Sequence, residues 1–260
     1  MMKLHSSDFF NIIETSLKRI SNVLLLNASF TDNLGLLNGK MGIEIFFYHY
    51  FRYTRNKIFE EYADELIDET YSEINFNTPV NLADGLTGIG WGIEYLVNKG
   101  FVQADTDDAL SEIDAAVYRI RLNTPVLVNP HDSFFSFGHY YISRLYGHKI
   151  NDEDINTLIK KYHLIFMIDE CERIILNRNY LTNGQEALSV DQLESITWFI
   201  HEADRLGIFP AKTKKILEKI PGYSSSDGRD TSILGNDGNE FSENDVDIFI
   251  KSAWQRADIP

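Results

Sequence analysis

Hydrophobic residues recur at helical spacing along most of the chain. The segment that begins at Asp8, a residue suited to capping a helix, places Ile12, Ile13, Ile20 and Val23 on one face. Comparable spacings predict further amphipathic helices over residues 56–74, 106–120, 152–176, 189–203, 213–220 and 244–257. The helix at 189 opens with a predicted capping box, in which Ser189 and Gln192 satisfy each other's backbone amides.

Between these amphipathic segments lie shorter stretches that are apolar nearly all round. They cover residues 42–53, 92–97 and 138–146. Helices of this kind are normally buried, so the alternation predicts an inner layer of helices and an outer layer. Strand signals are sparse, and the Thr-Pro-Val segments at 78–80 and 124–126 are typical of turns before helices. The sequence therefore predicts an all-α fold.

The chain also contains an internal repeat. Residues 35–44 align with residues 85–94 at an offset of 50, and five of the ten positions are identical. The identities fall on Gly35, Leu36, Gly42, Ile43 and Glu44 of the first copy. A fainter third copy begins at Gly138. Each copy follows a polar loop and opens one of the apolar helices, so we predict consecutive helical hairpins.

The repeated glycines suggest how the hairpins assemble. Glycine adopts backbone angles that suit tight loops, and its small size lets helix starts converge. Hairpins that converge in this way predict an α/α toroid over residues 1–220, with the loops around a central cavity. Helix dipoles would favour anionic groups there. Residues 221–260 are expected to form an acidic, flexible loop and a C-terminal helix.

Two motifs carry a resemblance to a known family. The Gly-Leu-x-x-Gly-x-x-Gly of residues 35–42 and the Asp-Gly-Leu-Thr-Gly-Ile-Gly-Trp-Gly of residues 84–92 resemble repeats of lanthionine synthetase C-like proteins. The resemblance is best over residues 1–100 and extends to about residue 205. It implies an α/α toroid. It also implies a zinc site of two cysteines and a histidine that adds a peptide cysteine thiolate to a dehydrated Ser or Thr.

The sequence differs from that family at the zinc ligands on which the family's reaction depends. Its one cysteine, Cys171, is followed by Glu172, so neither two thiolates nor a Cys-His pair is present. Asn38 stands where family repeats often carry a histidine. We therefore expect no zinc and no other cofactor. The hypothesis is a catalytically incomplete relative that binds a modified peptide or its maturation enzymes as an accessory protein.

Several polar residues near the repeat loops are candidates for a site. Asp84 is interpreted as a general acid or base, or a cavity contact, and alternatively as a helix cap. Glu44 and Glu94 occupy equivalent repeat positions and either face the cavity or tie hairpins together. His131 and Asp132 lie in the loop of the third copy.

Ligand contacts are assigned to the same region. The expected ligand-binding residues are Asn38, Asp84, Trp91 and His139, although core packing is the alternative for Trp91. A different hypothesis is a carbohydrate-active enzyme of the toroid type, which needs two carboxylates across a cleft. Its catalytic candidates are Asp84, Glu44, Glu94 and Asp132.

The net charge of the chain limits the classes of molecule that it is expected to bind. The 260 residues include 24 Lys and Arg against 39 Asp and Glu, which gives a net charge of −15. Such a chain is a poor candidate for binding nucleic acid or an anionic membrane. Apolar runs fall short of the roughly 20 residues of a membrane span, and a secretory signal is lacking, so the cytoplasm is expected. Dimerisation is expected to cover the open edge of a short toroid.

Overall fold

A computed structural model describes residues 6–123, 133–146, 155–176 and 188–220. Across these ranges every regular element is a helix and no β-strand occurs, so the all-α prediction is confirmed. None of the described helices combines the length and the apolar character that a membrane crossing requires. Residues 221–260, with their predicted loop and helix, lie outside the described ranges.

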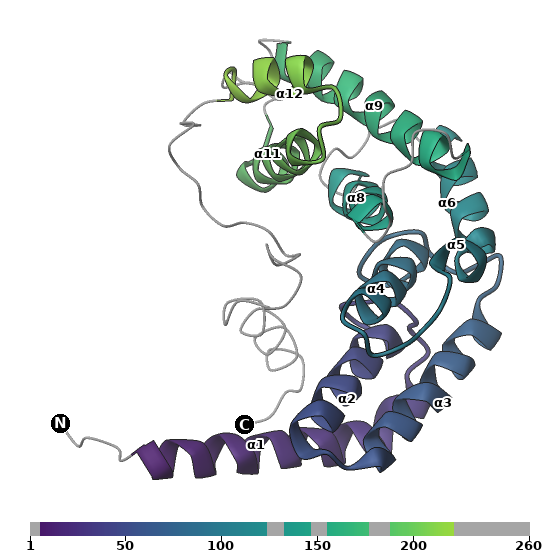
Figure 1. The fold of residues 1–260 in the computed structure, drawn as a ribbon, viewed down its shortest axis with the longest axis vertical. Helices are drawn as coiled ribbons and strands as arrows, with labels where there is room; N and C mark the ends of the chain where they lie inside the picture. The colour runs from purple at the N-terminus through teal and green to yellow at the C-terminus, as the bar shows by residue number, and fades with distance from the viewer. Residues whose placement is uncertain (1–5, 124–132, 147–154, 177–187, 221–260) are drawn as a thin grey trace.

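The helices alternate between two curved layers (Figure 1). The inner layer contains α2 (Lys40–Thr54), α4 (Leu86–Asn98), α8 (His139–Tyr146) and α11 (Val190–Arg205). The outer layer contains α3 (Lys57–Glu73), α5 (Thr106–Ala109), α6 (Ser111–Asn123), α9 (Ile155–Leu176) and α12 (Pro210–Leu217), and α1 (Ser6–Asn27) crosses the lower end of the arc. Short turns precede α2 and α8: η1 (Ala28–Phe30) and the π-helical η3 (Ser133–Gly138). The described part of the chain traces an open arc, so a closed toroid stays a prediction.

Burial follows the predicted alternation. In α4, every residue from Leu86 to Leu96 is buried. In α3, by contrast, only Ala63, Leu66 and Thr70 are buried, and most of the outward positions are acidic. Since each buried Leu or Ile side chain contributes about 1.5–3 kcal/mol, the inner helices supply more hydrophobic stabilisation than the outer ones.

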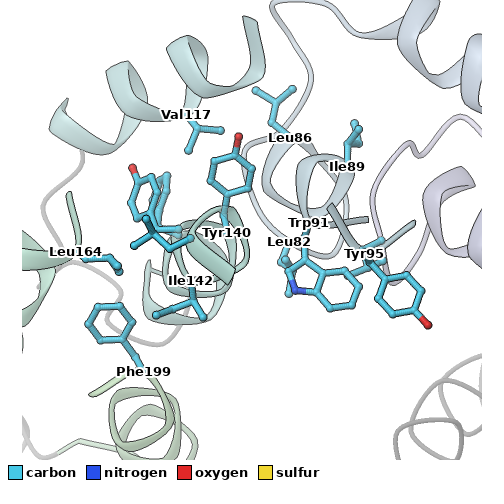
Figure 2. Packing of buried hydrophobic residues seen from close by; sticks show 14 of the residues in the cluster. Leu82, Leu86, Ile89, Trp91, Tyr95, Val117, Tyr140, Ile142, Leu164 and Phe199 are labelled. Atoms are coloured by element: carbon cyan, nitrogen blue, oxygen red, sulfur yellow. The ribbon is translucent and has the colours of Figure 1, made fainter. Parts of the chain in front are cut away.

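The core lies between the two layers. Figure 2 shows Tyr140 of α8 between its own helix and Val117 of α6, while Leu164 of α9 and Phe199 of α11 approach α8 from its other side. Tyr140, Ile142, Leu164 and Phe199 are fully buried. Residues far apart in sequence thus form one hydrophobic cluster, which holds successive hairpins together.

The helix boundaries confirm some predictions and correct others. The capping box at Ser189 is present: the Ser189 hydroxyl accepts from the Gln192 amide, and the Gln192 side chain accepts from the Ser189 amide. The helix expected over 106–120 is divided at Leu110, whose backbone leaves helical geometry while its side chain is fully buried. The helix expected from residue 213 begins at Pro210, because proline favours the first helical position.

Candidate functional site

The loops before α2 and α4 lie against each other. The backbone amide of Leu36 donates to the carbonyl of Leu82 at 3.3 Å, and that of Leu37 donates to the carbonyl of Ala83 at 3.0 Å. The inner helices of two successive hairpins therefore begin at one joined pair of loops.

Backbone hydrogen bonds fix the register of the repeat. The amide of Lys40, the first residue of α2, donates to the carbonyl of Asn33 at 2.9 Å. The amide of Leu86, the first residue of α4, donates to the carbonyl of Pro79 at 2.8 Å. These equivalent contacts are 46 residues apart, so the predicted offset of 50 is one helical turn too long.

The glycines follow the same register. A Cβ on Gly42 would lie 2.3 Å from the carbonyl oxygen of Leu36, and one on Gly88 would lie 2.0 Å from that of Leu82. Neither glycine has a positive φ angle. The expected role in unusual backbone angles is therefore wrong for these positions, because the glycines are needed for close approach.

Gly35 brings the two loops into contact. A Cβ at this position would meet the backbone carbonyl carbon of Asp84 at 2.3 Å, well inside van der Waals distance. Only glycine allows the first loop to approach the second this closely. The approach sets the side chain of Asp84 beside two asparagines of the first loop.

We call Asn33, Asn38 and Asp84 the loop cluster. The Asp84 Oδ1 accepts hydrogen bonds from the side-chain amides of Asn33 and Asn38, both at 2.7 Å. Asn38 is exposed, whereas Asn33 and Asp84 are half-buried. The cluster thus fixes an exposed carboxamide at the start of two inner helices, where it can exchange hydrogen bonds with a ligand.

The structure brings together two of the predicted site residues, Asn38 and Asp84. The 46-residue register makes them equivalent positions of the repeat, which the sequence comparison did not reveal. Asn33 was not predicted. The signal that could have found it is its place at the end of the short polar run Thr31-Asp32-Asn33, two residues before Gly35.

Glu44 does not face a cavity. It is fully buried between α2 and α3, where the Thr70 hydroxyl donates to its Oε1 at 2.6 Å. Burial raises the pKa of Glu44 to about 8, so the side chain is mostly protonated at neutral pH. The cavity interpretation is therefore wrong, and the contact that Glu44 makes joins α2 to the next helix, α3.

Glu94 belongs to a different buried group, centred on Arg144 of α8. Arg144 pairs with Glu94, and it also donates to Asp107 and Asp114 at 2.8 Å each. Lys160 of α9 pairs with Asp107 as well. Glu94 and Arg144 are 1% and 0% exposed, so this cluster ties successive elements together through a buried ion pair. Sequence reasoning did not find it.

The predicted equivalence of Glu44 and Glu94 is therefore wrong. In the observed register Glu44 aligns with Gly90, and Glu94 lies one turn further along its helix. The offset of 50 aligned the two Gly-Ile-Glu segments with each other. These segments lie one turn apart relative to the starts of their helices, and their glutamates contact different residues. Neither carboxylate reaches solvent.

The aromatic candidates are core residues. Trp91 is 2% exposed and stacks on Tyr95 at a centroid distance of 5.4 Å, on the side of α4 opposite α6 (Figure 2). His139 begins α8 as predicted, but it is buried and stacks on Trp198 at 3.6 Å. Burial lowers the pKa of His139 to about 3, so its ring is neutral. Both expected ligand contacts are corrected to packing positions. His131 and Asp132 lie outside the described residues.

The described side chains do not fit the zinc site of the family. Cys171 is fully buried in α9, and burial raises the pKa of its thiol well above the ordinary value. In the described ranges no three His, Cys, Asp or Glu side chains converge as metal ligands. An apolar pocket of about 260 Å³ lies between α3 and α4, lined by Ile67, Tyr71 and Ile93, and is separate from the loop cluster.

Fold and site together define an all-helical protein of consecutive hairpins, whose first inner helices start at joined glycine-rich loops. No protein-family model, no curated protein and no solved structure matches the chain.

Proposed function

We propose that this protein is a lanthionine synthetase C-like helical-repeat protein that lacks the family's zinc ligands and binds a peptide. In this proposal it acts as an accessory protein in peptide modification, in the cytoplasm, with the peptide or its maturation enzymes as partners. The single observation that carries the proposal is the loop cluster, where two copies of the glycine motif hold an exposed asparagine in place.

The exposed carboxamide of the loop cluster is suited to hydrogen bonding with a peptide backbone. A peptide backbone offers N–H donors and C=O acceptors, and a carboxamide can pair with both. Because the amide nitrogen of Asn38 is held by Asp84, its carbonyl oxygen is presented as an acceptor. Fixing this side chain before binding lowers the entropy lost on association.

Charge adds a preference among peptides. The chain carries a net charge of −15, so long-range attraction favours neutral or basic peptides over acidic ones. The carbohydrate-active alternative is not carried forward, because Glu44 and Glu94 are both buried in contacts between helices.

The test is a screen of a random 12-residue peptide library, followed by fluorescence anisotropy with the selected peptides. We expect Asn38→Ala to weaken binding by about three- to tenfold, the loss of one well-placed hydrogen bond. The matched control is Asn77→Ala, which truncates an exposed asparagine in the loop before α4. Unchanged binding by Asn38→Ala, or a library that yields no ligand, would refute the proposal.

Metal content is measured on the same protein. After mild chelation and addition of zinc, plasma emission spectrometry should find less than about a tenth of a zinc ion per chain, since the chain has one cysteine and its thiol is buried. Near one zinc per chain would overturn the zinc-free assignment and return the protein to the enzymes of the family.

A further inference from the structure

Two phenylalanines are exposed on the loops that lead into α2 and α4, which are neighbours in the inner layer (Figure 1). Phe30 is the last residue of η1, and Phe76 lies in the loop between α3 and α4. Among the large apolar side chains that the structure describes, these two are the most exposed, at 82% and 95%. Because their rings stay in contact with solvent, they add little to the hydrophobic stabilisation of the fold.

The two rings occupy the same position of the repeat. Phe30 and Phe76 are 46 residues apart, which is the register set by the amides of Lys40 and Leu86. One further step of 46 reaches Leu122 in the last turn of α6, which is 60% exposed. Single exposed apolar residues are common on protein surfaces and need no explanation. An exposed apolar side chain that recurs at one repeat position indicates a shared contact.

Each phenylalanine is held by a hydrogen-bonded turn. Beside the first ring, the Thr31 amide donates to the carbonyl of Ala28 at 3.0 Å, and Ala28 is fully buried. Around Phe76, the Thr78 amide donates to the carbonyl of Asn75 at 3.0 Å, and the Asn75 amide donates to the Thr78 hydroxyl at the same distance. Side chains on fixed turns lose less conformational freedom when a ligand covers them, so more of the contact energy is kept.

Both turns are close to the loop cluster along the chain. Phe30 is three residues before Asn33, a member of the cluster, and Phe76 is three residues before Pro79, whose carbonyl accepts from the first amide of α4. Three extended residues span at most about 11 Å, so each phenylalanine lies within that Cα distance of a residue bonded to an inner-helix start. An extended peptide advances about 3.3 Å per residue, so one that contacts Asn38 reaches the rings within a few residues.

The charges around the rings favour a basic ligand. Residues 28–33 and 73–79 contain no Lys or Arg, whereas Asp32 and Glu73 are exposed acids. Glu73 contacts Lys40 at 2.7 Å, but Lys40 is shared with a second carboxylate. Aromatic faces near carboxylates attract cationic groups as well as apolar side chains.

We propose that Phe30 and Phe76 are the specificity contacts of the peptide site and select peptides that combine aromatic or aliphatic side chains with Lys or Arg. The inference rests on the proposed peptide binding and deepens it. Asn38 pairs with backbone groups that every peptide offers, whereas the rings distinguish one side chain from another. A covered aromatic ring buries about 150–250 Å², so two rings supply the apolar area that the polar loop cluster lacks.

The test extends the library selection to variants of the full chain. The wild-type protein should enrich peptides that carry Phe, Trp, Leu or Ile together with Lys or Arg. Phe30→Ala and Phe76→Ala should each weaken binding of the selected peptides about tenfold in fluorescence anisotropy, and selection on the double variant should lose the apolar enrichment. Since both side chains are exposed, the circular dichroism should not change. The matched control is Tyr53→Ala, an aromatic residue 60% exposed at the opposite end of α2.

The outcomes separate this inference from the proposed function. Peptides that need Asn38 but bind both phenylalanine variants at wild-type strength would overturn the inference alone. So would a wild-type selection of acidic peptides or of peptides without apolar residues. Binding that is weakened in the phenylalanine variants and unchanged in Asn38→Ala would support the rings as contacts and refute the loop cluster. A library that yields no ligand would overturn both.

Discussion

Replacing Glu44 with glutamine should stabilise the protein at neutral pH. Glu44 is fully buried and accepts one hydrogen bond, from the Thr70 hydroxyl. Lys40, whose charge also acts on Glu44, is held by Glu69 and Glu73. Burial dominates and raises the pKa of Glu44 from 4.5 to about 8. The folded protein therefore keeps a proton that the unfolded chain releases.

The sign and size of the effect follow from this difference. Between pH 4.5 and about 8 the folded state binds more protons than the unfolded state, so stability is lost as the pH rises. Each pH unit in this window is worth about 1.4 kcal/mol, which gives about 3 kcal/mol at pH 7. Glutamine keeps the Thr70 hydrogen bond and has no proton to lose, so Glu44→Gln escapes this loss.

The assay is urea unfolding of wild type and Glu44→Gln at pH 5, 6, 7 and 8. Other titrating groups act alike in both proteins, so they cancel in the difference between the two free energies of unfolding. That difference should grow with pH in favour of the variant. Glu61→Gln, at an exposed position of α3, serves as control and should show no such growth. A difference that stays constant from pH 5 to 8 would refute the reasoning and mean that Glu44 is ionised in the folded protein.

Three further substitutions test the packing. Gly35→Ala should lower the free energy of unfolding by about 1–3 kcal/mol in urea titrations, because its Cβ would lie 2.3 Å from the backbone of Asp84. Arg144→Met should cost about 3–5 kcal/mol by the same measurement, because it leaves Glu94 and neighbouring carboxylates without their buried cation. Ser189→Ala should cost about 1 kcal/mol, the value of the lost helix cap, and a shift of less than a few tenths would contradict the capping box.

The helices and their layers could be predicted from sequence because each leaves a local pattern. The buried run from Leu86 to Leu96 and the acidic outward face of α3 differ in composition, and the structure separates them into layers accordingly. The division of α5 from α6 at Leu110 leaves no such pattern, since the apolar spacing continues through it.

The register of the repeat could not be chosen from identities alone. The observed offset of 46 and the predicted 50 differ by about one helical turn, so both place similar side chains on similar faces. The hydrogen bonds of Lys40 and Leu86 to their loops distinguish the two, as do the matching close contacts of Gly42 and Gly88. The wrong offset also affected the prediction of the site. It paired Glu44 with Glu94, and it did not reveal that Asn38 and Asp84 are equivalent positions.

The Arg144 cluster lay beyond sequence reasoning for a different reason. Its members come from α4, α5, α6, α8 and α9, and apart from Glu94, which belongs to the repeat, none of them is marked by a motif. A buried arginine becomes evident only when the carboxylates that neutralise it are placed around it.

The distribution of polar side chains separates the residues that stabilise the fold from those at the proposed binding site. Within the inner helices, Glu44 and Glu94 are 0% and 1% exposed, and each is committed to a contact with another helix. At the helix starts, the loop cluster keeps Asn38 exposed although Asp84 fixes its position. Truncating a buried carboxylate therefore changes folding, whereas truncating Asn38 removes one exposed carboxamide and leaves the core intact. A ligand at the loops can contact Asn38 without disturbing either buried carboxylate, and this favours the loops as the place of the proposed binding.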